Sequence, residues 1–363
     1  MRSDQVTGRT RKTANPMTVS GKITENSLTK VEIETDSGPR SFDSALVERV
    51  VFGDVPPAYV EGQRYFDRGD YENSAAKYRL AAGDASARDV VKASARLLAA
   101  EALMSQGAMD SGACTRSAAE AGLFLADHPT NREVPRARMI QARATHLSGD
   151  PASAAELYRA LFREAEGETP TTGYSVYGCS LAGLRGMHAY LASGDVQRSK
   201  ELNNALDNTL VRVLGNMEED DKKRNLVLAI QSEARLGEGW RLLAEGRASQ
   251  ARSFFSGQLA NVPNTNGGPG SPALRDAARL GLAQAHLAGG QVRKAQITFA
   301  IVSAVGYASR DHWAEAQVGL ADCVLRLNDP DARGQARTWL ENVINVYGDT
   351  PAVLAAREKL ATL

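Results

Sequence analysis

Two patterns of apolar positions divide the chain. In residues 1–54 apolar and polar residues alternate: Val19 and Ile23 share one face of a run, and Val31 and Ile33 repeat the pattern. A period of two is typical of strands that bury one face. We therefore expect residues 1–54 to form a small β domain, either a barrel or a sheet.

This β domain has few large apolar side chains. Phe42, Val50 and Phe52 are the residues best placed to close its core. A unit of about 50 residues with so small a core is marginally stable by itself. We expect the domain to rest on the helices that follow, with the stiff Val55-Pro56-Pro57 segment setting its orientation.

The remaining residues, 55–363, have the spacing of amphipathic helices. Val90, Ala93, Leu97 and Met104 lie on one face of a helix with 3.6 residues per turn. Aromatic residues make up only 6% of the chain, so small aliphatic side chains must supply most of the core. The pattern predicts a second domain that is mainly α.

Short turns separate these helices and recur along the chain. Six of them contain a glycine, and successive glycines stand 38 to 52 residues apart. A seventh turn, at 328–331, has none. Recurrence of this kind is the signature of helical repeats, and it predicts about seven degenerate helical hairpins followed by a short capping helix. The turn glycines are Gly69, Gly107, Gly149, Gly194, Gly246 and Gly290.

Two further positions recur after most turns. A small residue comes about five positions after the glycine, and an aromatic residue often comes four positions later. A small side chain lets the second helix approach the first, and the glycine adopts the left-handed turn. The aromatic ring then fills the gap to the next hairpin. The small residues are Ser74, Ala154, Ser199, Ala251 and Ala295, and the aromatic ones are Tyr78, Tyr158, Phe255 and Phe299.

The first hairpin resembles a known repeat family. Residues 58–81, AYVEGQRYFDRGDYENSAAKYRLA, are similar to a tetratricopeptide repeat. Two later segments, 148–158 and 288–299, match it less completely. The residues that stand at the signature positions of the family are Gly62, Tyr65, Gly69, Tyr78 and Ala81.

The resemblance extends over roughly residues 56–363 and implies an α–α superhelix. The period here averages about 43 residues against 34 in the family, so helices or loops are longer. The strand-rich start followed by a first repeat also resembles a bacterial arrangement in which a small SH3- or Sm-like barrel precedes the repeats. Together these resemblances imply a non-enzymatic scaffold that binds protein partners, including other copies of itself.

In the resembling family the ninth position of each first helix faces the concave groove. The corresponding residues here mix charge and polarity, as a protein- or peptide-binding groove would. Among them Trp240 is the best single contact candidate, because tryptophan is enriched at binding hot spots; ordinary packing between helices is the equally expected alternative. The candidate groove residues are Gln63, Glu101, Arg143, His188, Trp240 and Gln284.

The charge balance argues against a general binder of nucleic acids or anionic membranes. Lys and Arg total 43, and Asp and Glu total 43, so the formal net charge is zero. The first 30 residues are an exception, with six basic residues against two acidic ones. A nucleic-acid-associated adaptor that uses this basic β domain is therefore the alternative function, and a disordered basic leader is the plainer interpretation.

No catalytic or metal-binding motif stands out. The five histidines form no zinc-ligand spacing, and the three cysteines lie far apart. No nucleophile elbow or phosphate-binding loop is present. We therefore expect no catalytic residue, no cofactor, no metal and no small-molecule substrate, with the histidines in structural or surface roles. They are His128, His146, His188, His286 and His312, and the cysteines are Cys114, Cys179 and Cys323.

Targeting features are also missing from the chain as written. Residues 1–12 contain no apolar signal-peptide core, and no run approaches the roughly 18 apolar residues of a membrane span. We expect a cytoplasmic protein, or one of the periplasm or cell envelope if a signal lies upstream of residue 1.

Overall fold

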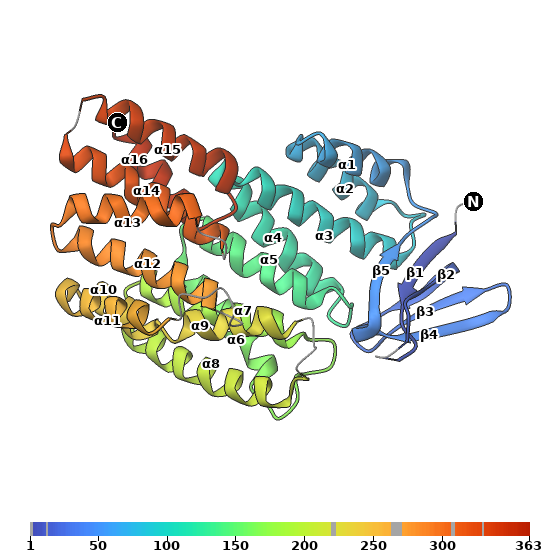
Figure 1. The fold of residues 1–363 in the computed structure, drawn as a ribbon. Coiled ribbons are helices and arrows are strands. Elements are labelled where there is room, and N and C mark those ends of the chain that lie inside the picture. The colour runs from blue at the N-terminus through green and yellow to red at the C-terminus, as the bar shows by residue number, and fades with distance from the viewer. Residues whose placement is uncertain (1–2, 12–13, 219–222, 263–270, 306–308, 329) are drawn as a thin grey trace. The chain divides into compact units, whose positions relative to one another are not determined.

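The protein is mainly helical, with a small antiparallel sheet at its N-terminus (Figure 1). A computed structural model describes residues 3–11, 14–218, 223–262, 271–305, 309–328 and 330–363. Helices hold 69% of the described residues. The predicted fold class, a mainly α chain preceded by a small β domain, is confirmed.

The five strands form one open sheet. The order is β4-β3-β2-β1-β5, every neighbouring pair is antiparallel, and β4 and β5 are the two edges. Of the two predicted forms, the sheet is therefore the one observed. The strands are β1 (Asp4–Gly8), β2 (Met17–Asn26), β3 (Lys30–Thr35), β4 (Gly38–Asp43) and β5 (Val47–Val51).

One face of the sheet carries the apolar core that the alternation predicts. Phe42 is buried in it, with Val50 and Phe52 partly buried against the same cluster, so the predicted closing residues are confirmed. Val6 is also fully buried, on β1, which lies between β2 and the edge strand β5. Val90 of the third helix packs on this core, as expected of a domain that rests on its helices.

The helices follow one another in pairs joined by short turns. The pairs among the described residues are α1/α2, α3/α4, α5/α6, α7/α8, α9–α10/α11, α12/α13 and α14/α15, and α16 comes last, in agreement with the predicted hairpins and cap. The helices are α1 (Pro57–Asp67), α2 (Tyr71–Gly83), α3 (Asp89–Gln106), α4 (Ser111–Asp127), α5 (Val134–Leu147), α6 (Pro151–Phe162), α7 (Val176–Ala192), α8 (Val196–Asn216), α9 (Arg224–Ala234), α10 (Gly237–Ala244), α11 (Ala248–Asn261), α12 (Ser271–Ala288), α13 (Val292–Val305), α14 (Arg310–Leu327), α15 (Ala332–Tyr347) and α16 (Ala352–Ala361), with short 3-10 helices at Ser44–Leu46 and Arg163–Ala165.

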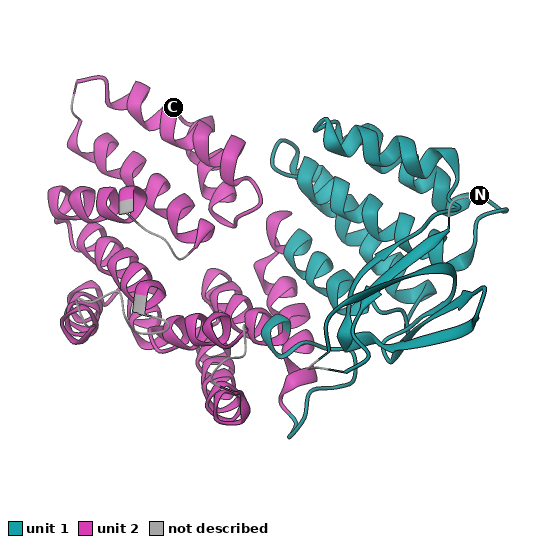
Figure 2. Cartoon of the chain, turned by 45° about the vertical axis from the view of Figure 1, so that its right-hand side comes forward, with its two compact units in different colours: residues 1–145, 167–178 teal, residues 146–166, 179–363 magenta. Residues whose placement is uncertain are grey.

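The chain divides into two compact units (Figure 2). Unit 1 comprises residues 1–145 and 167–178, and unit 2 comprises residues 146–166 and 179–363. Unit 1 therefore contains the whole sheet together with the first helices.

The sheet ends at Val51 and α1 begins at Pro57, on either side of the predicted limit between the domains 1–54 and 55–363. The division into domains 1–54 and 55–363 stays a prediction, and so does the low stability of the first domain by itself.

Most turns have the left-handed glycine that the sequence predicts. The exception is Gly107, whose φ of −55° is right-handed and whose Cβ position is filled by the Cys114 sulfur. In the turn that lacks a glycine, Asn328 takes the left-handed conformation with φ of 52°. The left-handed turn glycines are Gly69, Gly149, Gly194, Gly246 and Gly290.

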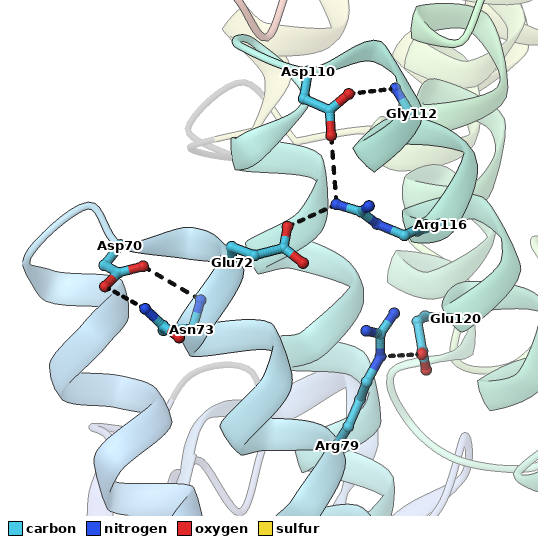
Figure 3. Close-up of polar contacts among 8 residues, drawn as sticks. All are labelled: Asp70, Glu72, Asn73, Arg79, Asp110, Gly112, Arg116 and Glu120. Carbon is cyan, nitrogen blue, oxygen red and sulfur yellow. Dashed lines mark hydrogen bonds and ion pairs between the residues drawn. The ribbon is translucent and has the colours of Figure 1, made fainter.

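Aspartates cap the helices that follow several of these turns. The Asp70 carboxylate accepts a hydrogen bond from the Asn73 N–H at 3.3 Å, and Asp110 accepts one from the Gly112 N–H at 2.9 Å (Figure 3). The same cap begins α6 and α8. Each cap satisfies one of the free N–H groups in the first helical turn, so at these four turns the aspartate defines where the second helix begins. The second helices α11 and α15 begin without a side-chain cap.

Second helices of neighbouring hairpins are linked on their exposed face. Arg116 of α4 lies 2.6 Å from Glu72 of α2, and the Arg79 Nε donates to Glu120 at 2.5 Å (Figure 3). Exposed ion pairs of this kind contribute little, about 0.2–1 kcal/mol each. The stability of the array must therefore come from the buried side of the hairpins.

The small residues that recur after the turns let the second helix of a hairpin pack closely against the first, as the sequence predicts. Ser74 and Ser199 are fully buried, and each hydroxyl donates to a carbonyl of the preceding first helix. The acceptors are the Gly62 carbonyl at 2.9 Å and the Met187 carbonyl at 3.1 Å. A serine at this position thus satisfies its own polar group while it brings two helices together.

The sheet of unit 1 is bound to the helices through Asp4. Its side chain is only 2% exposed and accepts two hydrogen bonds from Arg88 at 2.6 and 2.7 Å. The N–H groups of Ile23 and Gly53 donate to the same carboxylate at 2.8 and 2.7 Å. Burial by itself would raise the pKa of Asp4, but these hydrogen bonds lower the pKa below its usual value.

A second contact joins the sheet to the turn between α4 and α5. The Arg132 guanidinium donates to the Val47 carbonyl at 2.7 Å, and the Leu28 N–H donates to the Thr130 carbonyl at 2.8 Å. Gly173, in the returning segment of unit 1, packs directly on Leu28. The sheet therefore rests on the helices of unit 1 at both ends.

We expect Asp4→Ala to destabilise the protein by about 3–5 kcal/mol, because it leaves the Arg88 charge half-buried without its partner. The free energy of urea-induced unfolding measures the change. Asp89→Ala is the control, since that carboxylate is 93% exposed and lies 3.7 Å from Lys92; its cost should stay below about 1 kcal/mol. A similar loss of unfolding free energy in both variants would contradict the role given to the Asp4–Arg88 contact.

We expect Gly149→Val to lower the melting temperature more than Ser256→Val does. Gly149 has φ of 95°, a conformation that costs a residue with a Cβ about 1–2 kcal/mol or more. Ser256 is exposed on α11, where valine meets no such strain. Equal melting temperatures in the two variants, measured by circular dichroism, would argue against the turn assignment.

Candidate functional site

The six predicted groove residues all lie on first helices of the pairs. Three belong to unit 1 and three to unit 2, and their surroundings differ. They are Gln63 on α1, Glu101 on α3, Arg143 on α5, His188 on α7, Trp240 on α10 and Gln284 on α12. Their contact with a partner stays a prediction.

In unit 1, Gln63 and Glu101 take part in polar contacts that cross between helices. The Gln63 amide oxygen accepts from the Tyr78 hydroxyl at 3.1 Å. Glu101 forms an ion pair with Arg136 of α5. Burial raises the pKa of Glu101 although the Arg136 charge opposes it. Arg143 is half-buried on the same helix as Arg136. Charges of both signs therefore line these first helices.

In unit 2, His188 belongs to a buried charged cluster. The Glu233 Oε1 of α9 lies 3.3 Å from the His188 Nε2 and 3.2 Å from the His312 Nε2 of α14. One carboxylate oxygen thus connects three helices that are far apart in the sequence. His312 is 5% exposed and Glu233 17%, whereas His188 is 35% exposed, so the cluster reaches solvent at His188.

The charges of His312 and Glu233 determine each other's protonation state. Burial by itself would lower the pKa of His312, but the Glu233 charge and hydrogen bond raise it to about 9. Burial by itself would raise the pKa of Glu233, but His312 and His188 hold it well below its usual range. The pair is therefore an imidazolium and a carboxylate at neutral pH.

A fourth ionisable group, His146, lies close to the cluster. It is buried, and burial together with His188 and Arg185 lowers the pKa of His146 to about 4. His146 is therefore neutral near pH 7, so only part of the histidine set carries charge.

Trp240 does not present its ring to solvent. The residue is 7% exposed, and the indole lies between His188, at 5.8 Å between ring centroids, and Phe255, at 5.0 Å. Packing between helices, the alternative considered for Trp240 from the sequence, therefore describes its position.

Gln284 connects two first helices. Its amide nitrogen donates to Glu315 of α14 at 3.0 Å. Burial raises the pKa of Glu315, and the nearby His312 charge opposes the rise. Gln284 thus contacts the same helix, α14, that supplies His312.

Sequence reasoning found His188 but missed its partners. Glu233 and His312 stand 79 residues apart and on different repeats, and no spacing motif marks such a pair. The histidines were expected in structural or surface roles. His312 does act structurally, since it binds a buried carboxylate.

The basic residues of the N-terminal domain are partly neutralised. Arg9 lies 2.9 Å from Glu48, and Lys30 lies 3.0 Å from Glu25 and 2.7 Å from Glu32. Two more of the predicted basic residues, at positions 2 and 12, lie outside the described residues. Arg11 and Lys22 are exposed, so among the described residues the basic charges of this domain are neutralised only in part.

The cysteines and the possible metal ligands offer no further site among the described residues. All three cysteines are buried, and none of them forms a disulfide bond. Where the structure describes side chains, no group of three or more His, Cys, Asp or Glu is arranged to hold a metal ion. Across the described residues, every helix is too short or too polar to cross a bilayer.

Comparison with known proteins finds no family model that matches this chain. No curated protein matches it either.

The histidine–glutamate cluster predicts a pH dependence of stability. Because the folded pKa of His312 is about 9 and its ordinary value is 6.5, its contribution is fully present below about pH 6.5 and is lost as pH rises through 9. Urea unfolding measured from pH 6 to 10 should show this loss. His312→Asn should flatten the profile, and His286→Asn, on α12, should leave it unchanged. A parent profile without the alkaline loss would contradict the ion pair.

A second variant tests the carboxylate itself. Glu233→Gln keeps an acceptor of the same shape but removes the charge that compensates His312. We expect it to cost about 3–5 kcal/mol at pH 7, the range for a broken buried pair. A loss below about 1 kcal/mol would mean that the cluster is solvated like a surface pair.

Proposed function

We propose that this protein is a non-enzymatic scaffold that binds protein partners through the surface of its helical repeats, and that these repeats are of the tetratricopeptide type. The observation that carries the proposal is the recurrent hairpin, in which five of the six candidate groove residues on first helices are polar. Such arrays offer extended binding surfaces because each hairpin adds one more row of side chains.

The character of the exposed first-helix residues supports this function. Gln63 is exposed, and His188 and Gln284 are half-buried. A surface of mixed charge and amide groups suits the polar rim of a protein–protein interface. The support is architectural, since a fold by itself permits many functions.

The alternative, an adaptor that binds nucleic acid through the N-terminal domain, receives less support. Nucleic-acid affinity comes mainly from basic side chains that are available to phosphates. Arg9 and Lys30 are instead held by carboxylates. We therefore carry the protein scaffold forward as the proposed function.

Affinity capture of the intact chain from its source cells, with mass spectrometry of the bound proteins, tests the proposal. We expect Gln63→Arg, on first helix α1, to reduce recovery of the partner. Gln197→Arg makes the same change at an exposed position on second helix α8 and should leave recovery intact.

Equal recovery with both variants would contradict binding through the first helices. Loss of all bound material after nuclease treatment would favour the nucleic-acid alternative.

Self-association belongs to the same test. Deleting residues 1–53 would remove Asp4 from Arg88, so the sheet cannot be removed without disturbing the helices. Self-association is therefore measured on the intact chain, by ultracentrifugation over a range of concentrations, rather than by deletion. A chain that stays monomeric throughout would rule out copies of itself as partners.

A further inference from the structure

In the first four hairpins, neighbouring second helices neutralise each other's charge. Glu72 of α2 pairs with Arg116 of α4, and Arg198 of α8 lies 2.7 Å from Glu156 of α6. These ion pairs show that the second helices of successive hairpins lie side by side. The helices α2, α4, α6 and α8 together contain almost equal numbers of basic and acidic residues. Their exposed faces therefore carry no strong charge of either sign.

The last three hairpins have a different charge pattern. Their second helices, α11, α13 and α15, contain five basic residues and one acidic residue, Glu341. The sequences of α11 and α13 contain no acidic residue at all. The chain as a whole is neutral, so this excess of positive charge is local. The five basic residues are Arg252, Arg293, Lys294, Arg333 and Arg337.

The helices α11, α13 and α15 all belong to unit 2 and stack in succession. α12 packs against both α11 and α13, and α14 packs against both α13 and α15 (Figure 1). In unit 1, α3 packs in the same way against α2 and α4, whose side chains meet in an ion pair. Because the hairpins repeat one arrangement, α11, α13 and α15 lie side by side as α2 and α4 do.

The basic side chains of these helices reach solvent. Arg293, Lys294, Arg333 and Arg337 are exposed, and Arg252 is half-buried. With the residues that the structure describes, Lys294, Arg333 and Arg337 form no ion pair. Their positive charge is therefore available to the carboxylates of another molecule.

Two exposed isoleucines lie beside these charges on α13. Ile297 is 63% exposed and Ile301 is 40% exposed. Lys294 and Arg293 precede Ile297 by three and four positions, and Ile301 follows it by four, so the four side chains share one face of the helix. Apolar side chains next to a cluster of positive charge indicate a surface that contacts a molecule with both acidic and apolar groups.

We propose that the exposed face of α11, α13 and α15 is a docking surface for an acidic segment of a partner protein. This basic second-helix face consists of the five basic residues together with Ile297 and Ile301. The basic side chains donate to aspartate or glutamate carboxylates of the segment, and the isoleucines contact an apolar side chain between them. The surface lies on second helices, so it goes beyond the proposed function, which concerns the first helices.

The side chains of this face favour a protein over other acidic molecules. Four of its five basic residues are arginines, whose planar guanidinium matches a carboxylate and which are enriched at protein interfaces, where lysine is depleted. Single-stranded nucleic acids stack their bases on aromatic side chains, and bilayer surfaces are bound through interfacial tryptophan and tyrosine. The exposed positions that the structure describes on α11, α13 and α15 carry no aromatic residue.

The width of the face sets the length of the segment. Packed helices lie about 8–10 Å apart, so three neighbouring second helices span about 20 Å. An extended chain advances about 3.3 Å per residue, so about six residues cross the face. A short extended segment with several carboxylates is therefore enough to reach all three helices.

The test uses a fluorescein-labelled peptide in which pairs of glutamates alternate with single leucines. Its binding to the intact chain is followed by fluorescence anisotropy. We expect saturable binding that weakens as salt is added. The same peptide with glutamine in place of glutamate should bind about tenfold more weakly or worse, because it has no carboxylates for the basic side chains. Absence of saturable binding, or equal binding of the two peptides, would overturn the proposal.

A matched pair of variants locates the contact. Lys294→Glu should weaken binding of the glutamate peptide about tenfold or more, because it reverses a charge within the face. Lys200→Glu makes the same change at an exposed position on second helix α8 and should bind like the parent. Equal weakening in both variants would mean that only the overall charge of the protein matters, which overturns the proposed surface.

Two further measurements separate the apolar contact and the rival partner. Ile297→Ser should weaken binding of the leucine peptide but not of a peptide with serine in place of leucine, since the two changes remove the same contact. Equal weakening with both peptides would overturn the role of Ile297. Vesicles of phosphatidylserine and phosphatidylcholine are tested in parallel. Binding to the phosphatidylserine vesicles without binding to the glutamate peptide would overturn a protein partner in favour of an anionic bilayer.

Discussion

A buried aromatic ring that packs on a glycine of a facing helix sets the spacing of the helices. The Tyr78 ring lies 2.9 Å from the position that a Cβ on Gly62 would take. The Phe255 ring is still closer to such a position on Gly281 of the next hairpin. Any side chain at these glycines would push the helices apart, so an aromatic ring at one position requires a glycine at the other.

This constraint explains why the sequence predicts the repeats well. Turn, cap, small residue and ring all lie within one hairpin, and their spacing is fixed by local helical geometry. The prediction was wrong where a turn departs from the pattern. At Gly107 the chain turns without a left-handed residue, and the Cys114 sulfur occupies the space beside it.

Other parts of the structure could not be predicted from the sequence, because they depend on distant residues. Asp4 and Arg88 meet across 84 positions, and Glu233 meets His312 across 79. No pattern of apolar neighbours marks Asp4 as buried, and from the sequence it counts only as one of the two acidic residues among the first 30. Trp240 could be selected as a contact candidate, but its burial between His188 and Phe255 follows from the packing of two neighbouring hairpins.

The way the sheet is held has a consequence for synthesis on the ribosome. A chain that emerges N-terminus first has all five strands available before Arg88 exists to compensate Asp4. The partner of Leu28 at Thr130 and the packing of Gly173 come later still. The five strands are therefore synthesised before the residues that complete their contacts, and the nascent sheet must wait until Gly173 has been made.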